Sequence, residues 1–273
     1  MSDKISLSGR ILLAIVSTRI GNYLANRMAG PLNRNIERNI QSLAAKISPE
    51  TSVQDGLFKG LKYPGVRSYG STILPKLAGA YEVAVQEQLQ ELLDEKNYTT
   101  IIDIGCAEGY YAVGMALMQP EAKVIAYDLA ILAQALCAEM AELNGVRDRI
   151  EIAGECKKES LKSLNFNEGR VLVICDCEGG EYELIKPEYF ISSETDFIIE
   201  LHDVSVDKIK NKKLAESFSQ THNIIMIKEK AKDPNQFASL EKLSSWEKTQ
   251  AINESRPFFM EWMVLTTKNP THH

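Results

Sequence analysis

Two short segments hold the residues with the clearest chemical potential, and each begins where an apolar run ends. The first, IIDIGCAEGYY (101–111), places Asp103 immediately before a loop with glycines at 105 and 109. The second, VICDCEGGE (173–181), holds Asp176, Glu178 and Glu181 around a pair of glycines. Glycines let the backbone approach a ligand closely, and carboxylates attract cations. We therefore expect a nucleotide-like ligand at the first segment. At the second segment we expect chemistry that depends on the negative charge of the carboxylates.

The first loop favours S-adenosylmethionine over a dinucleotide. A dinucleotide loop has the pattern G-x-G-x-x-G, and here Tyr110 stands where the third glycine would be. Asp103 and Glu108 would repel a pyrophosphate, but they suit a ligand with an amino group and a sulfonium charge. The expected contacts from this loop are Asp103, Gly105, Cys106, Ala107, Glu108, Gly109 and Tyr110.

The next two apolar runs add further cofactor candidates. KVIAYD (123–128) ends in Asp128, whose carboxylate could accept hydrogen bonds from both ribose hydroxyls, with Leu129 beside it. Enzymes that bind NAD share such an acid, so it does not separate the two cofactors. RIEIAG (149–154) leads to Glu155 and Cys156, where an adenine edge would lie. Asp176 is expected to complete the cofactor-binding set.

His202, in the segment ELHD, is the best candidate for a general base that takes the proton of a substrate hydroxyl. Together with Asp176 and Glu178 it forms the predicted catalytic group. Two other roles stay open for it. The same three side chains could bind Mg²⁺ or a similar ion, and His202 could instead orient the substrate or serve only the structure.

The elements that position these residues form an alternating pattern from residue 99 onward. Apolar runs at 99–105, 123–128, 149–154, 170–176, 196–202, 223–229 and 258–267 are predicted strands. Amphipathic helices are predicted between several of them, for example over 131–145. The pattern predicts an α/β fold with a doubly wound, seven-stranded, largely parallel sheet, whose ligands bind at the carboxyl ends of the strands.

The chain is predicted to divide into an N-terminal cap (1–80) and a main domain (81–273) with a polar, partly helical insertion near 231–257. Apolar residues at i, i+4 spacing predict two helices between residues 5 and 47, and a hairpin or loop should follow. A further helix is expected over 79–95. The helical pair would serve as a substrate lid or as the contact of a homodimer. An alternative is that the basic face formed by Arg10, Arg19 and Arg27 lies on a membrane.

Several segments together resemble the FkbM-type methyltransferases. VICDCEGGEYELI (173–185) is similar to that family's D-x-E-G-x-E-x-x-[LV] signature, and IIDIGCAEGYYAVGMAL (101–117) is similar to its first motif. FIIELHD (197–203) and GSTILPKLAGAYE (70–82) also resemble family segments. The resemblance covers roughly 70–205 and implies a Rossmann-like class I methyltransferase sheet and O-methylation of a small molecule such as a sugar or a secondary metabolite. Cys106 and Glu108 depart from the alanine and asparagine common in the family. Residues expected to line the substrate side are Tyr69, Lys76, Tyr81, Glu82 and Arg256.

The composition of the chain limits the partners, metals and cellular locations that we expect for it. The net charge is −6 with both signs well mixed, which argues against nucleic acid as a partner. Five cysteines without a C-x-x-C pair argue against zinc and suggest reduced thiols in the cytoplasm. The apolar run ILLAIVS (11–17) is too short for a bilayer span and has no signal-peptide cleavage site, so no stable membrane insertion is expected.

Alternatives to O-methylation are an NAD-dependent oxidoreductase, N-methylation of a peptide or an amine, and a non-catalytic S-adenosylmethionine-binding subunit.

Overall fold

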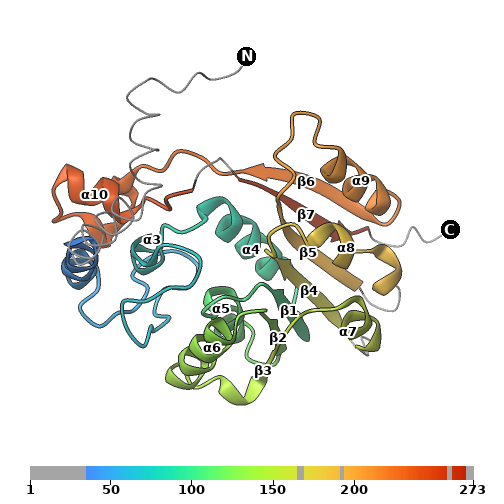
Figure 1. Cartoon of the computed structure of the whole chain (residues 1–273), viewed down its shortest axis with the longest axis horizontal. Coiled ribbons are helices and arrows are strands. Elements are labelled where there is room, and N and C mark those ends of the chain that lie inside the picture. The colour runs from blue at the N-terminus through green and yellow to red at the C-terminus, as the bar shows by residue number, and fades with distance from the viewer. Residues whose placement is uncertain (1–34, 165–168, 191–193, 257–259, 269–273) are drawn as a thin grey trace, which may run out of the picture.

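The computed structural model describes residues 35–164, 169–190, 194–256 and 260–268 (Figure 1). Of the two predicted N-terminal helices, the first lies outside these residues. The second is a helix over residues 35–47, as predicted.

Seven strands form one sheet in the order β3-β2-β1-β4-β5-β7-β6. The strands are β1 (Thr100–Ile104), β2 (Lys123–Tyr127), β3 (Ile150–Ala153), β4 (Arg170–Cys175), β5 (Glu194–Leu201), β6 (His222–Lys228) and β7 (Glu261–Thr267). Strands β1 to β5 are parallel, whereas β7 inserts antiparallel between β5 and β6. The order reverses between β1 and β4, so the crevice outside their carboxyl ends is the expected ligand site. The predicted doubly wound, seven-stranded sheet is confirmed.

Helices cover both faces of this sheet. They are α3 (Ile73–Ala78), α4 (Val83–Glu95), α5 (Tyr110–Met118), α6 (Ile131–Leu143), α7 (Lys158–Ser163), α8 (Glu181–Leu184), α9 (Ile209–Phe218) and α10 (Ser245–Ala251). No helix among the described residues is long and apolar enough to cross a bilayer.

The core lies in two layers because successive strand side chains point to opposite faces. Ile101 of β1 joins the cluster beneath α4, α5 and α6, whereas the adjacent Ile102 joins the cluster beneath α8 and α9. On β4, Leu172 and Val173 divide between the layers in the same way. Both faces of these strands are apolar, which explains why each of them appears in the sequence as a continuous apolar run.

The described part of the cap and the insertion pack against each other, in the part of Figure 1 that holds α3 and α10. The Nζ of Lys46, in helix 35–47, lies 2.5 Å from the Oε1 of Glu247 in α10. The hydroxyl of Thr72 donates to the carbonyl of Asn253 over 3.2 Å, and the amide of Ser239 donates to Asp55 over 3.2 Å. Segments from opposite ends of the chain therefore form one lobe next to the sheet.

Three short helices were not predicted. The segment 50–80 has a single bridge between Ser52 and Lys62, but it continues into α3 instead of remaining a hairpin and a loop. Helices α7 and α8 are the other two. Each of the three has six residues or fewer, which is too short to establish a helical periodicity. The predicted helix 79–95 begins later, at Val83, because Glu82 takes a left-handed conformation (φ 47°).

Candidate active site

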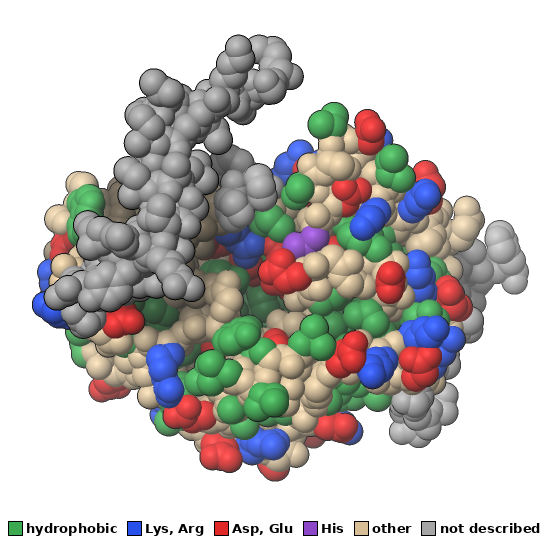
Figure 2. Space-filling model, in the orientation of Figure 1, with side chains coloured by type: hydrophobic (Ala, Val, Ile, Leu, Met, Phe, Trp, Pro, Cys, Tyr) green, Lys and Arg blue, Asp and Glu red, His purple; other side chains and the backbone are tan. Residues whose placement is uncertain are grey.

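A cavity of about 730 Å³ opens at the carboxyl ends of β1, β2, β4 and β5. On the face shown in Figure 2, a histidine lies beside acidic side chains in the central hollow. Most of the predicted site residues line this cavity. They are Tyr69, Lys76, Tyr81, Asp103, Gly105, Cys106, Ala107, Tyr110, Asp128, Leu129, Glu155, Cys156, Asp176, Glu178, His202 and Arg256. The structure therefore brings together residues separated by more than half of the sequence.

Gly105 lets the loop after β1 lie directly against the end of β4. Its φ is 89°, and a Cβ atom at this position would lie 1.7 Å from the carbonyl oxygen of Asp176. Any side chain would collide with backbone, so glycine is required here. This close approach places the loop after β1 and the acidic segment after β4 beside the same cavity.

Asp103 presents a buried carboxylate to the cavity. Its side chain is 2% exposed, and its Oδ2 atom has no hydrogen-bond partner within the described protein. Burial raises the pKa of Asp103 to about 8, with further contributions from Asp176 and Asp128. A buried acceptor without a partner is unfavourable. Because Asp103 lines the cavity, a cationic ligand would supply the missing partner.

Asp128 is held in place by the loop that it faces. Its carboxylate accepts hydrogen bonds from the amide of Ala107 at 2.9 Å and from the amide of Ala130 at 2.8 Å. A carboxylate has about four acceptor positions, so lone pairs remain for a pair of ligand hydroxyls. This arrangement fits the ribose of a nucleoside.

Glu108 does not line the cavity, and its carboxylate is bound within the protein, which corrects the expectation that it binds the cofactor. It is 2% exposed, and its Oε1 lies 2.6 Å from the Nζ of Lys76, which is also 2% exposed. Its carboxylate also accepts hydrogen bonds from the hydroxyls of Tyr63 and Ser68 and from the amide of Tyr69. Burial alone would raise the pKa of Glu108, but the charge and the hydrogen bonds of Lys76 outweigh it, and the pKa falls below its usual value. Glu108 thus anchors the segment that carries Tyr69 over the cavity.

Gly109 also has a structural role and does not line the cavity. It begins α5 with φ 99°, and a Cβ there would lie 2.9 Å from the Sγ of Cys137 in α6. Tyr110, the next residue, is buried with its ring edge-on to Phe58 at 5.1 Å and to Tyr81 at 5.3 Å. The bulk of Tyr110 therefore packs the floor of the cavity.

Of the residues predicted for the substrate side, Glu82 is the one that does not line the cavity. It is 3% exposed and forms ion pairs and hydrogen bonds with Arg256 and Tyr111. Arg256 lines the cavity, but it also pairs with Glu200 and with Glu254, the latter at 2.8 Å. Lys76 and Arg256 are therefore both engaged by carboxylates of the chain, so neither is free to attract an anionic substrate.

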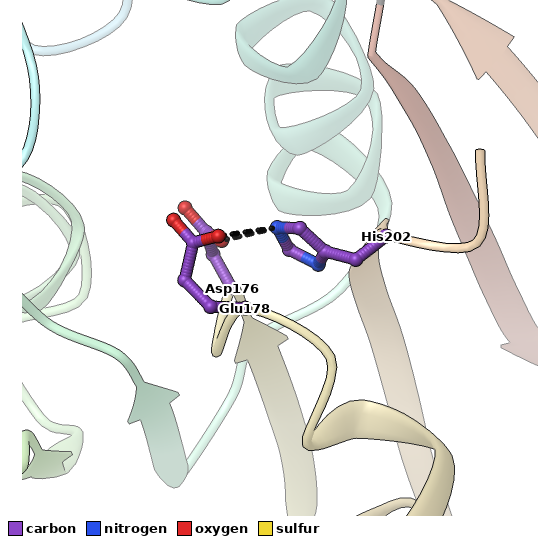
Figure 3. Close-up of side chains that lie close together, drawn as sticks. All are labelled: Asp176, Glu178 and His202. Carbon is purple, nitrogen blue, oxygen red and sulfur yellow. Dashed lines mark ion pairs between the residues drawn. The ribbon is translucent and has the colours of Figure 1, made fainter.

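His202, Asp176 and Glu178 form a compact cluster at the ends of β4 and β5 (Figure 3). The Nε2 of His202 lies 3.5 Å from the Oδ1 of Asp176 and 3.6 Å from the Oε2 of Glu178. Both carboxylates face the imidazole in Figure 3. Burial lowers the pKa of His202, but the hydrogen bond and charge of Glu181, with the charges of Asp176 and Glu178, more than reverse this effect. The predicted catalytic group is therefore assembled in space.

Two buried acids next to this cluster were not among the predicted site residues. Glu181, fully buried in α8, accepts a hydrogen bond from the His202 amide at 3.1 Å, and its Oε1 lies 3.2 Å from Nδ1 of the same residue. Glu200 is 2% exposed on β5, and burial, with a further contribution from Asp176, raises its pKa to about 10. The signal for Glu200 was present in the sequence, because an acid inside the apolar run FIIEL is costly to bury without a partner.

All five cysteines are free thiols. The Sγ atoms of Cys175, the last residue of β4, and Cys177 lie 3.5 Å apart. Burial and the interaction with Cys177 raise the pKa of the Cys175 thiol, which disfavours a reactive thiolate.

Comparisons with known proteins give structural likeness alone. No protein-family model matches the chain, and no curated protein matches its sequence. Among solved structures, a precorrin-6y C5,15-methyltransferase from Geobacter metallireducens has a TM-score of 0.48 at 12% identity, covering 69% of this chain and 90% of its own. An O-methyltransferase from Bacillus cereus in complex with SAH has a TM-score of 0.44 at 13% identity, covering 66% of this chain and 79% of its own. At this level of likeness the FkbM resemblance stays a prediction.

The fold prediction rests on the strand order of this chain. The order β3-β2-β1-β4-β5-β7-β6, with β7 antiparallel, is the sheet expected for class I methyltransferases, and that prediction is confirmed.

Proposed function

We propose that this chain is an S-adenosylmethionine-dependent methyltransferase that methylates a hydroxyl oxygen of a small molecule. The observation that supports it best is the buried carboxylate of Asp103 at the cavity wall, whose Oδ2 has no hydrogen-bond partner among the described residues. A dinucleotide would bring a pyrophosphate to this loop, where Asp103 would repel it. A ligand with an ammonium and a sulfonium group would complete the hydrogen bonding and balance the charge.

The residues present fit this cofactor along the whole cavity. Gly105 removes the side chain that would block the loop, and Asp128 has acceptor positions left for ribose hydroxyls. Glu155 and Cys156 line the cavity beyond the end of β3, where the adenine was predicted to lie. When bound, the cofactor supplies a methyl group on a sulfonium, which an oxygen attacks in line so that an O–C bond forms as the C–S bond breaks.

The protein's contribution is then to position the acceptor and to remove its proton. His202, Asp176 and Glu178 lie at the ends of β4 and β5, on the same cavity as Asp103 and Asp128. Glu181 holds the imidazole through Nδ1, which leaves Nε2 toward the cavity. The hydroxyl is expected to lose its proton at this cluster. Tyr69, Tyr81 and Arg256 line the same cavity and would surround the acceptor.

Binding calorimetry with S-adenosylmethionine and with NAD tests the cofactor. We expect the wild-type chain to bind S-adenosylmethionine and not NAD. Asp128→Asn should weaken binding about 10- to 100-fold, because a charged hydrogen bond contributes about 1.5–3 kcal/mol. Asp148→Asn, an exposed acid outside the cavity, is the matched control and should bind like wild type. Binding of NAD alone would overturn the proposal.

A further inference from the structure

The cluster at the ends of β4 and β5 has a feature that a general base does not need. Asp176, Glu178 and His202 each present one donor atom, and these three atoms all lie within 4.8 Å of one another. We propose that the cluster binds one divalent cation of the Mn²⁺ or Mg²⁺ class. The role of that cation in the reaction rests on the proposed function, but its binding does not.

The separations between donor atoms match a shared ion. Nε2 of His202 lies 3.5 Å from one carboxylate oxygen and 3.6 Å from the other. Two metal–ligand bonds of roughly 2.1 Å would span this distance at an angle of about 110°, and the donor atoms would need to approach by about 0.5 Å to reach the 90° of an octahedral ion. A direct hydrogen bond between nitrogen and oxygen would be shorter, at about 2.7–3.2 Å. The distance from Nε2 to each carboxylate oxygen is thus longer than a typical hydrogen bond, and it leaves room for an ion between the atoms.

The surroundings of His202 match those of a metal ligand. Metal-binding histidines usually donate their other ring nitrogen to a carboxylate, which fixes the ring and the tautomer. Here the fully buried Glu181 lies 3.2 Å from Nδ1 and also accepts the His202 amide. Nε2 is thereby directed to Asp176 and Glu178, as Figure 3 shows.

A second, independent observation is an unsatisfied atom. The Oδ1 of Asp176, which faces Nε2, is shielded from solvent and has no hydrogen-bond partner in the described part of the chain, although the Asp176 side chain as a whole is 33% exposed. Buried carboxylate oxygens normally find a donor or a cation. Four carboxylates lie within 3.9 Å of the one imidazole, namely Asp176, Glu178, Glu181 and Glu200. Arg256 pairs with Glu200, which leaves three carboxylates for one protonated imidazole, and a divalent ion would balance this excess of negative charge.

The donor set also indicates the class of ion. Two carboxylate oxygens and one imidazole nitrogen are mixed, mainly hard donors, which suit Mn²⁺ or Mg²⁺ better than a thiolate-seeking metal. The side chain of Glu178 is 89% exposed, so the site is open on one side. Water or the acceptor oxygen could fill the remaining positions. His202 would then be a ligand, and the ion would acidify the acceptor hydroxyl, whose proton would pass to solvent.

Titration of the metal-free full-length chain with MnCl₂, followed by electron paramagnetic resonance, tests the site. We expect one Mn²⁺ per chain, with nitrogen-14 modulation from a directly bound imidazole. Asp176→Asn and His202→Ala should weaken binding at least tenfold, and Glu181→Gln about 10- to 100-fold, as for the loss of an outer carboxylate. Glu183→Gln also removes a carboxylate from the cavity but forms no ion pair with His202, so it should bind Mn²⁺ like wild type.

The wild-type spectrum keeps the test independent of whether each variant folds. Absence of stoichiometric Mn²⁺ binding, or bound Mn²⁺ without nitrogen modulation, would overturn the site. Calorimetry with S-adenosylmethionine on the same sample separates the two proposals. Cofactor binding without Mn²⁺ binding would refute the metal site and leave the methyltransferase proposal intact, whereas Mn²⁺ binding without cofactor binding would support the site and refute the function.

Discussion

Asp103 illustrates how burial sets the charge of one side chain. Without a ligand its pKa is about 8, mainly because burial disfavours the charged form. In the unfolded chain its pKa would be about 3.9. Between these two values the folded protein holds a proton that the unfolded chain releases, so the contribution of Asp103 to stability is largest at low pH and is lost as the pH rises through 8.

Asp103→Asn should remove this dependence on pH. Because the asparagine does not titrate, the free energy of unfolding of wild type relative to the variant should fall by about 1.4 kcal/mol per pH unit between roughly pH 5 and 7. Urea denaturation of both proteins across this range measures the difference. A constant difference between the two would show that Asp103 is already ionised in the folded protein.

Lys76 and Glu108 are two residues whose contacts could not be predicted from the sequence. Both were predicted to bind ligand. The structure pairs them with each other at 2.6 Å, and of the two only Lys76 lines the cavity. They are 32 residues apart, and only the tertiary packing of the segment 63–76 on the loop brings them together. Asp103, Asp128 and Asp176 could be placed from the sequence because each lies at the carboxyl end of a strand, whose position the fold fixes.

The predictable elements are those with a long or repeated pattern. The strands of the sheet appear as apolar runs, and α6 is a helix of 13 residues, so their positions could be predicted within a few residues. Helices α3, α7 and α8 are short, and their existence depends on contacts with distant segments. Glu181, which holds His202, lies on one of these short helices, which is why the orienting acid was not assigned this role.

The turn between β1 and α5 is the element on which the site depends most. Gly105→Ala would place a Cβ 1.7 Å from the Asp176 carbonyl oxygen in addition to straining a backbone with φ of 89°. We expect a loss of more than about 3 kcal/mol in the free energy of unfolding, or failure to fold, together with loss of cofactor binding.

Gly60→Ala separates strain from collision. Gly60 has φ of 93°, and a Cβ there would meet nothing within 4 Å, so this control carries the backbone cost alone, about 1–2 kcal/mol. Chemical denaturation and calorimetry of both variants make the comparison. Equal losses in the two proteins would show that the close approach of β1 and β4 does not matter.

At the scale of the whole molecule, a buried charge network ties the insertion to the sheet. Arg256 forms ion pairs with Glu82 before α4, with Glu200 on β5 and with Glu254. Lys232 also pairs with Glu254 and with Glu229. The lobe that holds α3 and α10 is therefore connected to the cavity wall by a few charges that lie mostly out of solvent.

Arg256→Met should test this connection. Removing the cation leaves Glu82 and Glu254 buried with less compensation, and breaking such a network costs about 3–5 kcal/mol. Hydrogen exchange should accelerate over residues 229–256 and at the start of α4, while β1 and β4 stay protected, because the loss acts where the insertion meets the sheet. Arg67→Met removes an exposed pair with Glu139, with side chains 57% and 50% exposed, and should change the stability by less than about 1 kcal/mol. If Arg256→Met were as mild as this control, the lobe would be held by its apolar contacts and not by its charges.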